Sequence, residues 1–379
     1  MSTSPLAPAF SLYLDLARIL GAGAVVAAHF AYTGAVDPGA WGVAGGMGRE
    51  AVIMFFVLSG FVIAATTEQS RPDARSYAVA RLSRLYSVML PVLLLTLAGA
   101  AFLVAQGRSV PNASYALAKL QVYIPFYLLF LGQSWTLTET PPFMVPYWSL
   151  CYEAWYYLLF GLAYYLRGKR RMLALLLALA VMGYKMWMLL PVWLLGAWLY
   201  RSYRGPLMSQ GVARAGWAGS LLAFAIYVGA DLETPLRALG SAWWPLPALP
   251  LGSADRYLAD YLVCAIVVLN FACARDAGFT GLLRCKPAIR LLAGYTFTLY
   301  LSHMLVIGMW LAFYPHTRGN VLDVLALLLA ILLATVLLGA VTERRLPEWR
   351  ALFARLPGLR PSLIAGVSVA QSTSNNSVN

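Results

Sequence analysis

Long apolar runs separated by short polar loops make up most of this 379-residue chain. A helix needs about 20 apolar residues to cross a lipid bilayer. Ten runs are candidates, at residues 10–31, 50–68, 86–106, 147–166, 172–183, 185–200, 215–230, 257–274, 291–313 and 321–342. The stretch 172–200 is too long for one helix and has Gly183 near its middle, so we read it as two short helices. The pattern predicts an all-α polytopic integral membrane protein with about ten transmembrane helices.

An eleventh apolar run, at 117–132, is shorter and contains Pro125. It lies between the loops 69–85 and 167–171, which are both rich in arginine or lysine and should therefore both be cytoplasmic. An even number of crossings must separate these loops, although three apolar runs do. We therefore expect 117–132 to be a re-entrant or interfacial segment. With this choice both termini are cytoplasmic.

Composition supports a membrane protein, since 61% of the residues are hydrophobic and only 11% are charged. Soluble domains carry about 25% charged residues. The net charge of +13 comes from basic residues scattered among short loops, which is typical of cytoplasmic loops and argues against nucleic-acid binding. We expect one membrane domain at 1–350 and a disordered cytoplasmic tail at 351–379. No metal site is expected.

The first apolar run carries three ionisable residues, Asp15, Arg18 and His29. Eleven helical steps of 100° bring His29 to within about 20° of Arg18, about 16 Å further along the helix. Asp15 lies on the same face as Arg18. Because charges inside a bilayer are costly, such residues usually face a bundle interior or a hydrated cavity. We therefore interpret these three residues as a functional set on one face of the helix, with anchoring at the membrane surface as the alternative.

Several motifs occur together along the chain. They are Arg-x10-His (Arg18 and His29), GREAVIMFFVLSGFVIA (48–64), RLSRLYSVMLP (81–91), YWSLCYEAWYYLLFG (147–161), GYTFTLYLSHMLV (294–306) and TERRLP (342–347). In this order they resemble the acyltransferase family 3 membrane proteins over residues 10–350. The departures are small: Cys151 and Tyr152 fill a variable slot, and Ser87 stands where proline is common.

The resemblance implies an enzyme of the bacterial inner membrane. Such an enzyme moves an acyl group, most simply acetyl, from cytoplasmic acyl-CoA to a hydroxyl of an exported polysaccharide or lipid-linked oligosaccharide. Its partners are then acyl-CoA, the glycan acceptor and the lipid bilayer. Two alternatives use other acceptors or other chemistry. One is an acyltransferase for a small molecule or lipid, and the other is a transporter, although we find no two-fold repeat of broken segments.

His29 and Arg18 are the expected catalytic pair. A sugar hydroxyl needs a base before it can attack a thioester, and imidazole titrates near neutrality. His29 is either that base or a transient carrier of the acyl group, and the sequence leaves both open. Arg18 is suited to a phosphate or to the thioester carbonyl, with Asp15 as its charge partner.

Arg81 and Arg84 are expected to bind coenzyme A, whose phosphates suit guanidinium groups. They are three residues apart and so share a helix face at the cytoplasmic side. Composition alone favours plain anchoring of a positive loop, and it is the family resemblance that favours coenzyme A.

Glu153 is the third expected catalytic residue, because a carboxylate in an apolar helix needs a cation or a hydrated cavity. It would orient His29 or bind acceptor hydroxyls from the outer side. Trp148 and Ser149 precede it and are expected to contact substrate. The alternative for Ser149 and Glu153 is helix capping.

His303 is a further candidate for substrate binding, with a buried structural histidine as the equal alternative. Glu343 is expected to pair with the two arginines that follow it. Ser59 and Gly60 are read as small residues that let helices approach closely.

Overall fold

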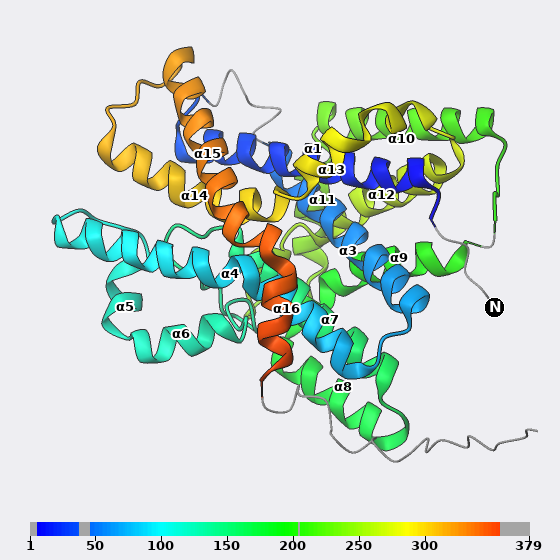
Figure 1. The fold of residues 1–379 in the computed structure, drawn as a ribbon, viewed down its shortest axis with the longest axis horizontal. Coiled ribbons are helices and arrows are strands. Elements are labelled where there is room, and N and C mark those ends of the chain that lie inside the picture. Colours follow the sequence, from blue (N-terminus) through cyan, green and yellow to red (C-terminus); the bar gives the residue numbers. More distant parts are fainter. Residues whose placement is uncertain (1–5, 38–45, 204, 357–379) are drawn as a thin grey trace, which may run out of the picture.

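The computed structural model describes residues 6–37, 46–203 and 205–356, and within them every regular element is a helix. This confirms the all-α class. The elements, shown in Figure 1, are α1 (Pro8–Thr33), α3 (Gly48–Ser70), α4 (Ala74–Ala105), α5 (Ala113–Ala118), α6 (Leu120–Leu128), α7 (Tyr147–Tyr165), α8 (Gly168–Met182), α9 (Tyr184–Ser202), α10 (Gln210–Gly229), α11 (Glu233–Trp243), η1 (Gly252–Ala254), α12 (Tyr257–Asp276), η2 (Thr280–Cys285), α13 (Lys286–Ala293), α14 (Thr296–Phe313), α15 (Val321–Val341), η3 (Glu343–Arg345) and α16 (Leu346–Ala354).

Seven described helices are long and apolar enough to cross a membrane, or eight if the bent pair α8 and α9 forms one span. The seven are α1, α3, α4, α10, α12, α14 and the continuous segment of α15 and α16. α7 matches the predicted span 147–166, but its many tyrosines and tryptophans leave it too polar for this criterion. The described residues thus reach fewer than the ten expected spans, and the exact count and the side of the termini stay predictions.

The stretch 172–200 forms two helices, as predicted. α8 ends at Met182, α9 begins at Tyr184, and their axes differ by 118°. Gly183 lies between them with φ +80°, a conformation that costs glycine little because it has no Cβ. The backbone N–H of Trp135 donates to the carbonyl of Met182 (3.2 Å), which holds the bend in place.

The run 117–132 contains the last two residues of α5 and all of α6, and Figure 1 shows these short helices at one edge of the molecule. Neither is long enough to cross a bilayer, so a re-entrant or interfacial segment remains consistent with the structure. The segment 231–256, which lies between two predicted spans, contains α11 and η1. At the C-terminal end, α16 continues past the expected domain boundary at 350, and residues 357–379 lie outside the described residues.

α3 is the central helix, with the most deeply buried apolar window of the seven. It packs against α1, α7, α9 and α12. A Cβ atom at Gly60 would collide with the carbonyl of Trp193, and one at Gly196 would collide with the carbonyl of Val57. Glycines at both positions therefore let the backbones of α3 and α9 touch, which confirms the packing interpretation of Gly60.

Candidate active site

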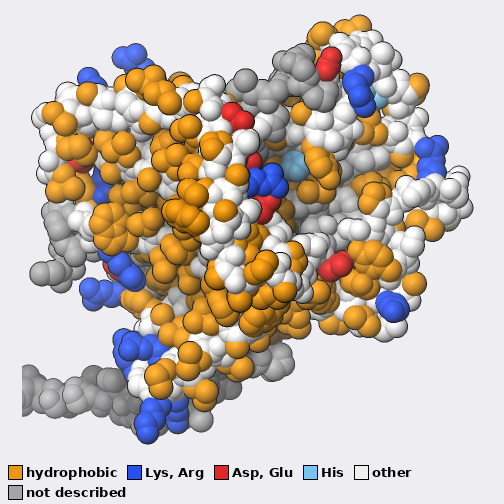
Figure 2. Space-filling view, turned by 180° about the vertical axis from the view of Figure 1, so that it is seen from behind, with side chains coloured by type: hydrophobic (Ala, Val, Ile, Leu, Met, Phe, Trp, Pro, Cys, Tyr) orange, Lys and Arg blue, Asp and Glu red, His pale blue; other side chains and the backbone are white. Residues whose placement is uncertain are grey.

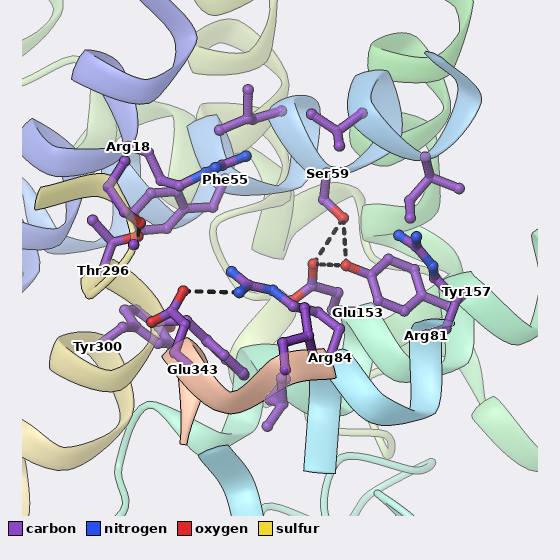
Figure 3. A pocket seen from close by; sticks show the side chains of 18 of the residues that line it. Arg18, Phe55, Ser59, Arg81, Arg84, Glu153, Tyr157, Thr296, Tyr300 and Glu343 are labelled. Atoms are coloured by element: carbon purple, nitrogen blue, oxygen red, sulfur yellow. Dashed lines mark hydrogen bonds and ion pairs between the residues drawn. The ribbon is translucent and has the colours of Figure 1, made fainter. Parts of the chain in front are cut away.

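A cavity of about 630 Å³ opens between α1, α3, α4, α7 and α14, and Figure 3 shows part of it. Six arginines and three carboxylates line this cavity, so positive charge exceeds negative charge by three. We call it the arginine-rich cavity. Its charged residues are Asp15, Arg18, Arg81, Arg84, Glu153, Arg290, Glu343, Arg344 and Arg350.

Arg18 lines this cavity as part of an arrangement centred on Asp15. Its guanidinium lies 3.3 Å from one oxygen of Asp15, which confirms the expected charge pair. Arg290 of α13 binds the other oxygen of Asp15 and also donates to Ser11 (2.9 Å). One carboxylate thus serves two guanidinium groups, and a positive charge remains for a ligand.

Arg81 and Arg84 differ in their partners although both line the cavity. Arg84 forms an ion pair with Glu343 (2.8 Å) and lies over the ring of Phe297. Glu343 was expected to pair with the two arginines that follow it, so the observed partner is a correction. The Nε atom of Arg81 is buried and has no hydrogen-bond partner among the described residues. Of the two, Arg81 is the one available to a ligand.

Glu153 also faces the arginine-rich cavity (Figure 3). It accepts hydrogen bonds from Ser59 (2.8 Å) and from the hydroxyl of Tyr157, and Trp193 donates to Ser59 (3.1 Å). The structure therefore does not bring Glu153 to His29, which was one of the two roles expected for it.

A second cavity, of about 650 Å³, lies toward the opposite ends of α1 and α3. We call it the histidine cavity because His29 lines it. Trp148 lines it too, as expected for a substrate contact, whereas Ser149 lines the arginine-rich cavity. Its other polar or aromatic wall residues are Tyr32, Arg49, Gln133, Thr138, Thr140, Glu233, Ser253, Arg256 and Tyr300.

His29 is paired with His303. Nδ1 of His29 lies 3.0 Å from Nε2 of His303 and 2.9 Å from the carbonyl of Val25, while Nδ1 of His303 lies 2.9 Å from the carbonyl of Leu299. A carbonyl only accepts, so Nδ1 of His303 carries the hydrogen and its Nε2 accepts. In the neutral pair, Nδ1 of His29 must then be the donor. The Nε2 of His29 is left with its lone pair.

His303 itself lies behind His29. Its side chain is fully buried and lines neither cavity. His303 therefore contacts His29 and does not line a cavity, whereas Trp148, the other expected substrate contact, does line one.

The two cavities share part of one wall, because Val52 and Tyr300 line both. The hydroxyl of Tyr300 is 2.5 Å from that of Ser149, and the edge of Phe55 meets the ring of Tyr300. Ser149 donates to the carbonyl of Pro146 (3.0 Å). A single hydrogen-bonded tyrosine thus stands where the cavities meet.

Arg49 enters the wall of the histidine cavity with its charge already compensated. Two of its nitrogens bind the carboxylate of Asp260 at 3.1 and 2.5 Å, and it donates to the carbonyl of Ser253 (2.7 Å). Its guanidinium also lies over the ring of Trp148, 4.6 Å from the centroid. Most of its donors are therefore occupied.

Arg256 is compensated in the same way. It forms ion pairs with Glu50 and with Glu233 (3.0 Å for the latter). Burial alone would lower the pKa of Arg256, but the two carboxylates outweigh burial, and its pKa is raised. Burial raises the pKa of Glu233, and the charge of Arg256 opposes that shift.

Sequence reasoning did not select the further arginines of either cavity. Arg290, Arg344 and Arg350 lie in basic loops, where anchoring explains a positive charge equally well. Arg49 and Glu50 open the GREAV block, so a charged pair at the start of an apolar run was the available signal. Within the described residues, no group of three or more possible metal ligands occurs.

One cavity suits an anionic ligand and the other presents an imidazole lone pair, and a group transferred between them would pass Tyr300. Two adjoining cavities of this kind within membrane helices are what a membrane-embedded transferase requires. The comparison with known families agrees, since the acyltransferase domain of acyltransferase family 3 matches residues 11–343. The chain belongs to this family and is an acyltransferase, as the motifs indicated. No curated protein and no solved structure matches it.

Proposed function

We propose that the protein transfers an acyl group, most simply acetyl, from cytoplasmic acyl-CoA to a hydroxyl of an exported or lipid-linked polysaccharide at the bacterial inner membrane. One observation carries the proposal. The cavity that contains His29 shares Val52 and Tyr300 with the arginine-rich cavity. A donor held in one cavity and an acceptor held in the other would meet beside the imidazole.

The arginine-rich cavity is the proposed donor site. Coenzyme A is a polyanion, and a surplus of three positive charges would compensate its phosphates. Arg81 has an unpartnered Nε, and neither Arg344 nor Arg350 forms an ion pair with any described residue. Arg18 lies further along α1 toward His29 and offers a donor to the thioester carbonyl. The proposed acyl-CoA site therefore includes more arginines than the expected pair, Arg81 and Arg84.

His29 is the proposed base, acting through Nε2. That atom takes the proton of the acceptor hydroxyl while the oxygen attacks the thioester carbon. The carbon–sulfur bond then breaks, and the proton passes to the leaving thiolate. A well-placed base of this kind contributes about 10²–10⁴-fold. In the alternative route, Nε2 attacks the thioester carbon, and the carbon–sulfur bond breaks with loss of the thiolate. The acceptor oxygen then attacks the acyl carbon, the carbon–nitrogen bond breaks, and the hydroxyl proton passes to the thiolate.

His303 supports either route as a positioning residue. Because it accepts from Nδ1 of His29 (3.0 Å), it keeps the hydrogen on that nitrogen and the lone pair on Nε2. Trp148 remains the proposed acceptor contact on the wall of the histidine cavity. Glu153, with its bonds to Ser59 and Tyr157, belongs to the proposed donor side.

The test is the ester content of the polysaccharide, measured by NMR in a strain that lacks the protein. Complementation uses the wild type, His29→Ala and, as a matched control, His316→Gln, since His316 lies in a loop outside both cavities. We expect the ester signal to disappear in the deletion strain and to return with the wild type and the control only.

Two results would contradict the proposal. An unchanged ester content in the deletion strain would remove the polysaccharide as acceptor and leave a small molecule or lipid. Full restoration by His29→Ala would remove His29 from the chemistry.

A further inference from the structure

The histidine cavity contains guanidinium groups without a surplus of positive charge. Two arginines reach its wall, and three carboxylates bind them: Asp260 on Arg49, and Glu50 and Glu233 on Arg256. These five groups together carry one negative charge. Counted by lining residues alone, this wall carries a surplus of one positive charge, from Arg49, Arg256 and Glu233, against three in the arginine-rich cavity. Asp260 and Glu50, which bind the two arginines without lining the cavity, offset that surplus.

The pairs are buried, which makes their charges hard to redirect. The side chains of Arg49 and Asp260 are 12% and 1% exposed, and those of Arg256 and Glu50 are 15% and 5% exposed. A ligand anion would have to displace a carboxylate from a buried guanidinium to obtain a counter-ion. Leaving that carboxylate unpaired in a buried place costs several kcal/mol.

The rest of the wall offers uncharged hydrogen-bonding groups. They are the amide of Gln133, the hydroxyls of Thr138, Thr140 and Ser253, and the ring of Trp148. Gln133 and Ser253 already bond each other (2.9 Å), which fixes their orientation. The charged groups of the molecule are mixed in sign here as well: Figure 2 shows basic, acidic and histidine side chains side by side near the middle of one face.

We propose that the histidine cavity selects an uncharged, polyhydroxylated acceptor unit, and that it discriminates against a sugar bearing a carboxylate or phosphate near the reacting hydroxyl. This inference rests on the proposed function and specifies its acceptor. Neutral hydroxyls can bond Gln133, the threonines and Ser253 without changing any ion pair. An anion meets guanidinium groups whose charge is already balanced by carboxylates, and it also meets the charge of Glu233, so its desolvation is poorly compensated.

The experiment uses the full-length protein in liposomes, acetyl-CoA, and pairs of methyl glycosides that differ only at C6. Each pair consists of a uronide and its uncharged uronamide, which have the same hydroxyls, for glucose, galactose and mannose, and ester formation is measured by mass spectrometry. We expect the neutral member of a pair to be acylated at least about tenfold faster at equal concentration. Glu233→Gln removes one negative charge and should narrow that ratio about threefold.

Asp260→Asn gives a stronger change, because it frees the guanidinium of Arg49 inside the cavity. We expect it to raise uronide acylation relative to the neutral sugar by more than Glu233→Gln does. Binding of acetyl-CoA to each variant shows that the donor side is still folded, and Glu233→Gln keeps the test available if Asp260→Asn does not fold.

The outcomes separate the two proposals. Equal or faster acylation of the uronides by the wild type would overturn the charge selection and leave the acyltransferase proposal standing. If no glycoside of any pair receives an acyl group in a His29-dependent way, the proposed transfer to sugar hydroxyls fails and the charge selection fails with it.

Discussion

The arginine-rich cavity and the histidine cavity are similar in volume, at about 630 and 650 Å³, and both are walled by α1, α3 and Tyr300. They differ in how their arginines are balanced. Six arginines face three carboxylates in the first, whereas each arginine of the second is held by one buried carboxylate, and Arg256 also by the half-buried Glu233. The same residue type is therefore left with a surplus of positive charge in one cavity and is held in ion pairs in the other.

The difference teaches that an arginine in a membrane protein is informative only together with its carboxylates. Arg81 and Arg84 stand three residues apart on α4 and are alike in sequence context. Glu343 holds Arg84 at 2.8 Å, while Arg81 keeps an unpartnered Nε. A buried ion pair is weak support for a ligand site, because its two charges already satisfy each other.

The largest expected effect is on the rate of acyl transfer, and it should leave acyl-CoA binding unchanged. His29→Ala should lower kcat by about 10²–10⁴-fold, the contribution of a general base. The dissociation constant for acyl-CoA should stay within about twofold, because His29 lies in the other cavity. Steady-state rates in liposomes and calorimetric titration of the donor measure the two quantities.

His303→Ala and His303→Gln refine this first prediction. A glutamine oxygen can still accept from Nδ1 of His29, so it should recover more activity than alanine does. The pH profile of kcat should move for alanine, since Nδ1 of His29 loses one of its two acceptors and keeps only the carbonyl of Val25. Equal activity in the two variants would mean that His303 only fills space.

Next in size is the contrast between the two arginines of α4. Arg81→Gln should weaken acyl-CoA binding by about tenfold or more, the value of a hydrogen bond to a charged group. Arg84→Gln should act mainly on stability, because it leaves the buried carboxylate of Glu343 without its partner. Donor titration and thermal unfolding in detergent, applied to both variants, measure this. Equal loss of donor affinity would remove the distinction between the two cavities' arginines.

Much of the fold follows from the apolar pattern. The helical period predicts α1, α3, α4 and α12, and a glycine in a run too long for one helix predicts the break at Gly183. α11 was missed because a loop rich in proline and tryptophan hides a single amphipathic helix. The exact number of spans stays a prediction, since the pattern does not show whether an apolar helix of 15 to 20 residues crosses the bilayer or bends back.

Less of the candidate site could be predicted. The 3.6-residue period relates Arg18 to His29, and each now lines a cavity. It cannot relate His29 to His303, which lies 274 positions away. Glu153 was predicted to lie with Trp148 at the outer end of its helix. Five helical steps separate the two residues, so their side chains point in directions about 140° apart. Trp148 and Glu153 therefore face different cavities.

A smaller effect is expected where α3 meets α9. Gly60→Ala would push its methyl group against the carbonyl of Trp193 and should cost about 1–3 kcal/mol of stability. Because α3 walls both cavities, donor binding and acyl transfer should fall together, unlike in His29→Ala. Gly23→Ala on α1 is the matched control, as no atom lies within 4 Å of a Cβ there. A stable Gly60→Ala variant with one function lost and the other kept would contradict this account of α3.

The smallest effect concerns the shared wall. Tyr300→Phe keeps the ring against Phe55 and removes only the hydroxyl that meets Ser149 at 2.5 Å. The expected loss is about 0.5–1.5 kcal/mol of stability, the net value of one hydrogen bond. Ser149→Ala removes the same bond from the other side, so the two losses should not add in the double variant. Additive losses in thermal unfolding would show that the two hydroxyls are not coupled. Tyr300 would then separate the cavities by the bulk of its ring alone, and a change in ring size, rather than loss of the hydroxyl, would be needed to join them.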